Sequence, residues 1–127
     1  MAANGVIRVH HTKTVDREWD SSVAERRLGD DDVRGFRRAF AFVDRREPEN
    51  KTDAKFPHHE VTSDGKVGAA NVRALINGVA ILNGGRGGAD ISERDRHGIY
   101  RHLAAHLKDA GREPPELQGS GGGRRAA

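Results

Sequence analysis

The sequence predicts a mainly α fold: a small helical domain built on an antiparallel helix pair at about 69–82 and 92–110. Apolar residues recur at helical spacing in both stretches, and a glycine-rich segment joins them. Two shorter helices are expected before this pair, and a short β element is left open. We expect a partly extended N-terminal arm over 1–18, the helical domain over 19–117, and a disordered Gly/Arg tail over 118–127.

The composition favours one small, thinly packed domain. Of the 127 residues, 35% are hydrophobic and 32% are charged, so the core is marginal unless something else braces it. There is no cysteine, hence no disulfide and no thiolate metal site. No apolar run approaches the ~20 residues that cross a bilayer, so no membrane association is expected. The 22 basic and 19 acidic residues are interspersed, so nucleic-acid binding requires the fold to separate the charges.

The N-terminal arm contains two weakly alternating stretches, Val6–Val9 and Thr12–Val15, either of which could be a short strand. His10 and His11 lie between them. Adjacent residues of a strand point to opposite faces, so these two histidines cannot share a metal there. The arm is expected to be polar and exposed.

Two short helices are predicted next. Trp19 precedes a polar N-cap segment, 20–22, and is expected to anchor the first helix to the core rather than to stack on a ligand. The acidic run 30–32 is interpreted as the capped start of the second helix rather than as a metal site or a site for an acidic partner. Phe36 and Phe40 lie on one face of that helix, at i and i+4.

The middle of the chain contains extended and turn segments. Residues 41–44 either continue the second helix or open a strand. Residues 55–61 are expected to be extended, because the residue before a proline avoids the helical region. Residues 62–66 have Asp-Gly at their centre and predict a turn.

The two strong helices have clear ends. The first ends at Asn83-Gly84. The glycine-rich run 83–88 fits neither of the phosphate-binding patterns GxGxxG and GxxxxGK[ST], and it follows a helix instead of a strand. We therefore interpret it as a hinge between the two helices. The second begins at Ser92, which with Asp95 resembles a capping box. It ends at Gly111.

The second strong helix carries a basic face opposite its apolar stripe. This face is the predicted partner-binding surface, the simpler alternative being an ordinary solvated helix face. Its residues are Arg94, His97, Arg101, Lys108 and Arg112.

Histidines lie on the flank of the same helix. His102 and His106 have the i, i+4 spacing of a zincin, but the sequence HLAAH lacks the general-base glutamate of HExxH. We expect them to be partly buried and hydrogen-bonded to Asp95, Asp109 or backbone carbonyls, without a metal or other cofactor. A site of histidines and carboxylates would assemble only if segment 58–60 packed against this flank. The residues assigned a structural role are Trp19, Phe36, Phe40, His58, His59, His102 and His106.

Several blocks of the sequence resemble a known module over about residues 10–117. It recurs in head-assembly genes of actinobacterial tailed phages and prophages, alone or within HK97-type prohead protease open reading frames. The blocks are His11-Thr12 with Trp19-Asp20, FRRAFAFVD at 36–44, KFPHHEV at 55–61, LNGGRGGADI at 82–91, and RHGIYRHLAAHLKDAGREPPEL at 96–117.

The resemblance implies a non-enzymatic head-assembly or virion structural protein that binds capsid or scaffold proteins, in the virion or the host cytoplasm. Protease activity does not transfer, because a prohead protease needs a larger domain with a serine–histidine pair and this chain offers no candidate serine. The alternatives are a DNA-binding protein using the basic face of the 92–110 helix with Arg124 and Arg125, and a small metal-dependent hydrolase. The oligomeric state stays open.

Overall fold

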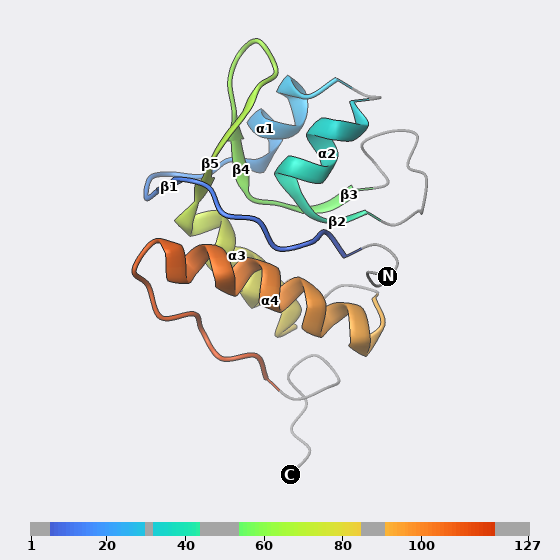
Figure 1. The fold of residues 1–127 in the computed structure, drawn as a ribbon, viewed down its shortest axis with the longest axis vertical. Coiled ribbons are helices and arrows are strands. Elements are labelled where there is room, and N and C mark those ends of the chain that lie inside the picture. The colour runs from blue at the N-terminus through green and yellow to red at the C-terminus, as the bar shows by residue number, and fades with distance from the viewer. Residues whose placement is uncertain (1–5, 30–31, 44–53, 85–90, 119–127) are drawn as a thin grey trace.

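The computed structural model describes residues 6–29, 32–43, 54–84 and 91–118, which contain four helices and five short strands (Figure 1). In chain order these are β1 (Thr14–Val15), α1 (Ser21–Arg27), α2 (Val33–Ala39), β2 (Phe40–Val43), β3 (Ala54–Pro57), β4 (His59–Val61), β5 (Val67–Asn71), α3 (Val72–Leu82) and α4 (Glu93–Asp109). The fold is an α/β mixture, so the prediction of a mainly α domain built on an antiparallel helix pair is wrong.

The strands form two small sheets. One has the order β1-β5-β4, with β1 parallel and β4 antiparallel to β5, and the other pairs β2 with β3 antiparallel. No strand in the described ranges exceeds five residues. β1 lies within the candidate strand 12–15, and β3 and β4 lie almost entirely within the segment 55–61 that was expected to be extended. β5 was missed, because its residues 69–71 were assigned to the following helix. Strands this short show little period-2 alternation, and β2 is buried along its whole length.

The N-terminal helices are capped by aspartates, as predicted. The Asp20 side chain accepts a hydrogen bond from the Ser22 amide, and that of Asp32 accepts one from the Gly35 amide. Residues 30 and 31 of the acidic run lie outside the described residues. Helix α2 ends at Ala39 and the chain continues directly into β2. Residues 41–43 therefore belong to a strand and do not continue the helix.

Helix α3 begins three residues later than predicted, because 69–71 belong to β5. The side chain of Asn71 accepts hydrogen bonds from the Arg73 and Ala74 amides and so caps α3. Gly84 and Gly111 both adopt a positive φ, as expected after a helix, whereas residues 85–88 of the predicted hinge lie outside the described ranges. None of the described helices is both long and apolar enough to span a membrane.

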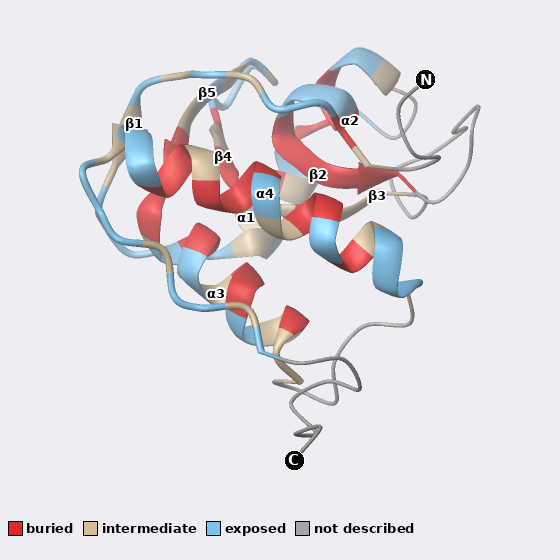
Figure 2. Cartoon of the chain, turned by 60° about the horizontal axis from the view of Figure 1, so that its bottom comes forward, coloured by how far each residue is buried: buried red, intermediate tan, exposed pale blue. Residues whose placement is uncertain are grey.

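Two apolar clusters hold these elements together. The larger cluster lies between the strands and the α3–α4 pair and includes Leu75, Val79, Ile99 and Leu103, all fully buried. Helix α4 accordingly shows one buried and one exposed face (Figure 2). The smaller cluster lies beneath α1 and α2 and contains Ala24, Leu28, Phe36, Ala39, Phe40 and Val61, with Trp19 packed at its edge.

The N-terminal segment lies against the domain. The Ile7 amide donates to the Ala41 carbonyl over 2.9 Å, and Val6 forms an antiparallel bridge with Phe42. In Figure 1 this blue segment runs between the α4 helix and the part of the fold that contains β2. It therefore brings His10 beside α4. The predicted tail lies outside the described residues from 119 onward.

Candidate functional site

Five histidines from three distant parts of the chain meet between α4 and the strands. Neighbouring ring centres lie 4.5 to 5.2 Å apart. The members of this histidine cluster are His10, His58, His59, His102 and His106. The last four have no exposed surface.

A backbone irregularity places both His58 and His59 in the cluster. Phe56 has a φ of 64°, which is unusual for a large side chain. Just after it the chain leaves the β2–β3 sheet and joins the other one, with His58 between β3 and β4. Because His58 lies outside both strands, the alternation of neighbouring strand residues does not apply to it, and both rings enter the cluster with their centres 4.5 Å apart.

The adjacent pair His10 and His11 behaves differently. Only His10 enters the cluster, whereas Nδ1 of the exposed His11 lies 2.8 Å from Oδ2 of Asp109. The two rings thus diverge, as the sequence predicted. The contribution of His10 was not anticipated, since nothing local in the sequence indicates that the arm packs beside α4.

Backbone carbonyls orient three of the five rings. Nδ1 of His58 lies 3.0 Å from the Phe56 oxygen, Nδ1 of His59 lies 2.8 Å from the Gly68 oxygen, and Nδ1 of His102 lies 2.8 Å from the Ile7 oxygen. A carbonyl only accepts, so each Nδ1 carries the hydrogen. Each Nε2 is then left with its lone pair, and Nε2 of His58 and of His102 lie 3.2 Å apart.

Burial keeps the cluster uncharged. It lowers the pKa of His59 and of His102 to about 4 and that of His106 to about 3, and it holds the pKa of His58 well below its usual value. Neighbouring histidines add to the effect on His58 and His106, because two imidazolium charges repel. At neutral pH the rings are therefore neutral, the form in which imidazole binds metals.

The carboxylates that the sequence placed near these histidines are engaged elsewhere. Glu60 binds the Arg17 guanidinium through both oxygens and accepts a hydrogen bond from Asn71 over 3.0 Å. Asp109 binds His11 instead of His102 or His106. Segment 58–60 does pack against α4, but it brings imidazoles without a carboxylate.

The predicted basic face borders a shallow groove of about 360 Å³. This basic groove is lined by Val6, Ile7, Arg8, Val9, Arg94, Gly98 and Arg101. All five predicted binding residues are exposed. Of these, Nε2 of His97 lies 3.1 Å from Oε2 of Glu93, and Arg112 forms an ion pair with Asp16 that offsets its charge. Arg94 and Arg101 form no ion pair with the described residues, and Arg8, which the sequence analysis overlooked, joins them.

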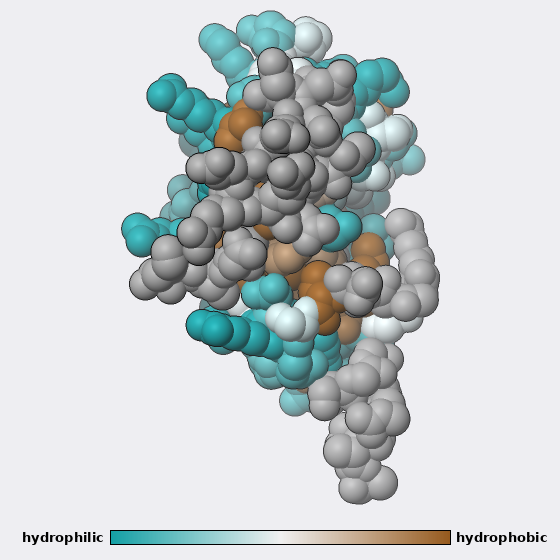
Figure 3. All heavy atoms as spheres, turned by 90° about the vertical axis from the view of Figure 1, so that its right-hand side faces the viewer, coloured by the Kyte–Doolittle hydropathy of each residue, from teal (hydrophilic) through white to brown (hydrophobic). Residues whose placement is uncertain are grey.

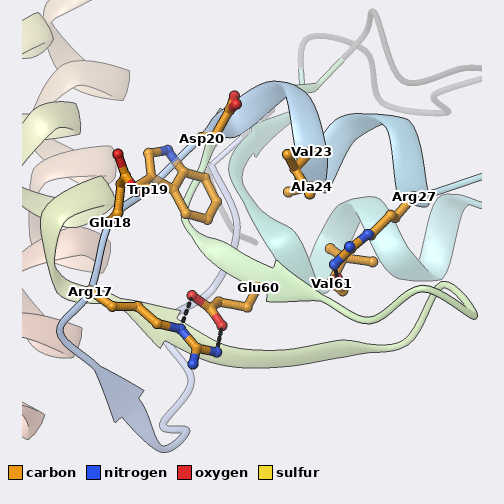
Figure 4. Close-up of a pocket in the computed structure, with 9 residues that line it drawn as sticks. All are labelled: Arg17, Glu18, Trp19, Asp20, Val23, Ala24, Arg27, Glu60 and Val61. Atoms are coloured by element: carbon orange, nitrogen blue, oxygen red, sulfur yellow. Dashed lines mark hydrogen bonds and ion pairs between the residues drawn. The ribbon is translucent and has the colours of Figure 1, made fainter.

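A second hollow of about 270 Å³ lies beside α1 (Figure 4). Arg17, Trp19, Arg27 and Glu60 line it, and the Arg17–Glu60 pair spans its floor. The charges inside this hollow are largely matched, so it offers no strong attraction for an ion. Trp19 lies at its edge while contacting the smaller apolar cluster.

Large apolar side chains are scarce on the surface. Where Figure 3 shows described residues, hydrophilic areas surround a few apolar ones. Among described residues, the exposed large hydrophobic side chains are Val9 and Ile76, at 40% and 39%. Val9 lies in the basic groove, which therefore combines an apolar contact with positive charge.

Comparison of the chain with protein-family models, curated protein sequences and solved structures finds no match.

Proposed function

We propose that this chain is a non-enzymatic phage head-assembly or virion structural protein that binds an acidic surface of a capsid or scaffold protein. The observation that carries the binding role is the basic groove, which Arg8, Arg94 and Arg101 line together with apolar residues. The assignment to head assembly rests on the resemblance of the sequence blocks.

The groove suits a protein segment that carries both carboxylates and small apolar side chains. Guanidinium groups bind carboxylates through paired hydrogen bonds, and the two from α4 lie seven residues apart, on one helix face. Val9 supplies apolar contact beside them. Duplex DNA would instead require a broad surface of positively charged side chains without acidic partners. On this face, Glu93 and Asp16 contact His97 and Arg112 and reduce the positive charge.

The test is co-sedimentation with capsid shells and with scaffold protein of actinobacterial tailed phages, at several salt concentrations. We expect binding to the wild type and at least ~10-fold weaker binding after Arg94→Ala with Arg101→Ala, because two charge-assisted contacts are lost. The matched control is Arg34→Ala with Arg38→Ala, which removes the same charge from exposed positions on α2.

Failure of the wild type to co-sediment at every salt concentration would refute the proposal. Equal weakening by the α2 control would show that net charge, not the groove, drives binding. A gel shift with duplex DNA that weakens steeply with salt, without capsid binding, would favour the DNA-binding alternative.

A further inference from the structure

We propose that the histidine cluster is a structural site for one divalent transition-metal ion of the Zn²⁺ class. His10, His58, His59 and His106 would supply ligands, with His102 as a fifth nitrogen donor beside them. One ring nitrogen from each of the first four lies within 4.8 Å of all the others. The sequence favoured metal-free structural histidines and made a metal site depend on segment 58–60 packing against the flank of the 92–110 helix; the part played by His10 was not foreseen.

The contact between His58 and His102 is the sharpest sign of a missing positive charge. Both rings donate from Nδ1 to a backbone carbonyl, so their Nε2 atoms face each other with lone pairs only 3.2 Å apart. Two such acceptors repel and cannot form a hydrogen bond. A cation bound at Nε2 of His58 would offset this repulsion between the two lone pairs.

Other nitrogens of the cluster also lack partners. Nε2 of His10, Nε2 of His59 and both ring nitrogens of His106 are buried and form no hydrogen bond with the described residues. Buried polar atoms nearly always have a hydrogen-bond partner, so several buried nitrogens without one in the same cluster require an explanation. A coordinate bond satisfies one nitrogen of each ring, and the carbonyls on His58 and His59 are the outer partners that metal-bound histidines commonly have.

The donor set selects the class of ion. It consists of imidazoles alone, since Glu60 and Asp109 are engaged by other side chains. Mg²⁺ and Ca²⁺ require oxygen ligands, whereas Zn²⁺, Ni²⁺, Cu²⁺ and Fe²⁺ accept imidazole. His58, His59, His102 and His106 have no exposed surface, which favours a closed structural site over a catalytic one with an open position.

Such an ion would fasten three parts of the fold together. It would join the N-terminal segment to the β3–β4 junction and to α4, in a domain whose apolar content is low. Small domains with thin cores commonly rely on a metal for stability.

The first experiment measures metal in the full chain, purified without a histidine tag from zinc-supplemented medium. We expect about one equivalent of a transition metal, a melting temperature at least ~10 °C lower after chelation, and recovery on adding Zn²⁺ or Co²⁺. X-ray absorption at the zinc edge should show histidine nitrogens in the first shell, a result that needs no variant. Metal-free protein with an unchanged melting temperature in Zn²⁺, Co²⁺ and Ni²⁺ would overturn the proposal.

Variants then locate the site. His106→Leu keeps the buried volume and removes a ligand, and His59→Gln removes another. Each should weaken Zn²⁺ affinity at least ~100-fold. His11→Gln and His97→Gln change exposed histidines outside the cluster and should leave the affinity unchanged. Loss of binding in these controls, with retention in the cluster variants, would place the metal elsewhere and refute the assignment.

Discussion

Helices α3 and α4 meet at Gly78, and a double-mutant cycle there tests the packing that positions the proposed binding face of α4. A Cβ atom on Gly78 would lie 2.8 Å from Cδ1 of Leu103, a contact closer than carbon atoms tolerate. Leu103 is fully buried, so its side chain has little room to move. The substitutions are Gly78→Ala, Leu103→Ala and both together.

The effect of Gly78→Ala on the free energy of unfolding should change sign when Leu103 is shortened to alanine. In the wild type, Gly78→Ala gains about 1 kcal/mol of helix propensity but costs about 1–3 kcal/mol in overpacking, so we expect a net loss of about 1 kcal/mol. Leu103→Ala alone should cost about 2–5 kcal/mol. With Leu103 shortened, the new methyl group fills vacated space, and Gly78→Ala should stabilise by about 1–2 kcal/mol.

The assay is urea unfolding followed by far-ultraviolet circular dichroism and by the fluorescence of Trp19, the only tryptophan. The coupling free energy should be about 2–3 kcal/mol, well above the ~0.5 kcal/mol expected for independent sites. Ala80→Gly on the exposed side of α3 is the control, and it should cost about 1 kcal/mol in both backgrounds. If Gly78→Ala has the same sign and size in both backgrounds, the close α3–α4 contact is refuted.

Three further predictions concern the histidines, the α3 cap and the N-terminal segment. The pKa of His59 and of His102 is lowered to about 4, so below pH 6.5 the unfolded chain takes up protons that the folded chain does not. In the presence of chelator, the free energy of unfolding should be highest above pH 6.5 and fall by about 1.4 kcal/mol per buried histidine by pH 5.5. A free energy of unfolding, measured with urea, that does not change between these pH values would contradict this. Asn71→Ala should cost about 1–3 kcal/mol, measured by urea unfolding, because it removes the cap of α3 and a buried amide. Asn71→Ser keeps an oxygen that can cap the helix and should recover part of the loss; equal losses in both variants would contradict the capping role. Gly98→Leu should displace the N-terminal segment, because even a Cβ atom at position 98 would lie 3.0 Å from Cγ2 of Val6. Hydrogen exchange at the Ile7 amide should then accelerate. Unchanged exchange would show that the segment is not packed against α4.

The sequence specified the parts of the fold that depend on local chemistry. The caps at Asp20, Asp32 and Ser92 follow from side chains that accept backbone hydrogen bonds within three residues. The helices over 72–82 and 93–109 follow from long apolar stripes at helical spacing.

The strands and the histidine cluster depend on contacts that no local pattern reveals. The strand His59–Val61 is only three residues long and begins with a buried polar residue, so it lacks an apolar alternation. His58 lies between two strands of different sheets, so the rule that neighbouring strand residues alternate does not hold for His58 and His59. One signal was available: a cysteine-free chain with two His-His pairs and a His-x-x-x-His helix holds enough imidazoles for a metal site.

The wide spacing of the histidine cluster along the chain also bears on how quickly the fold is reached and lost. Ninety-five residues separate Ile7 from His102, and 44 separate His58 from His102. Contacts between such distant residues form only after long loops have closed, so they are expected late in folding. Cluster substitutions should then hasten unfolding while hardly slowing folding, which makes the cluster a determinant of the lifetime of the native state.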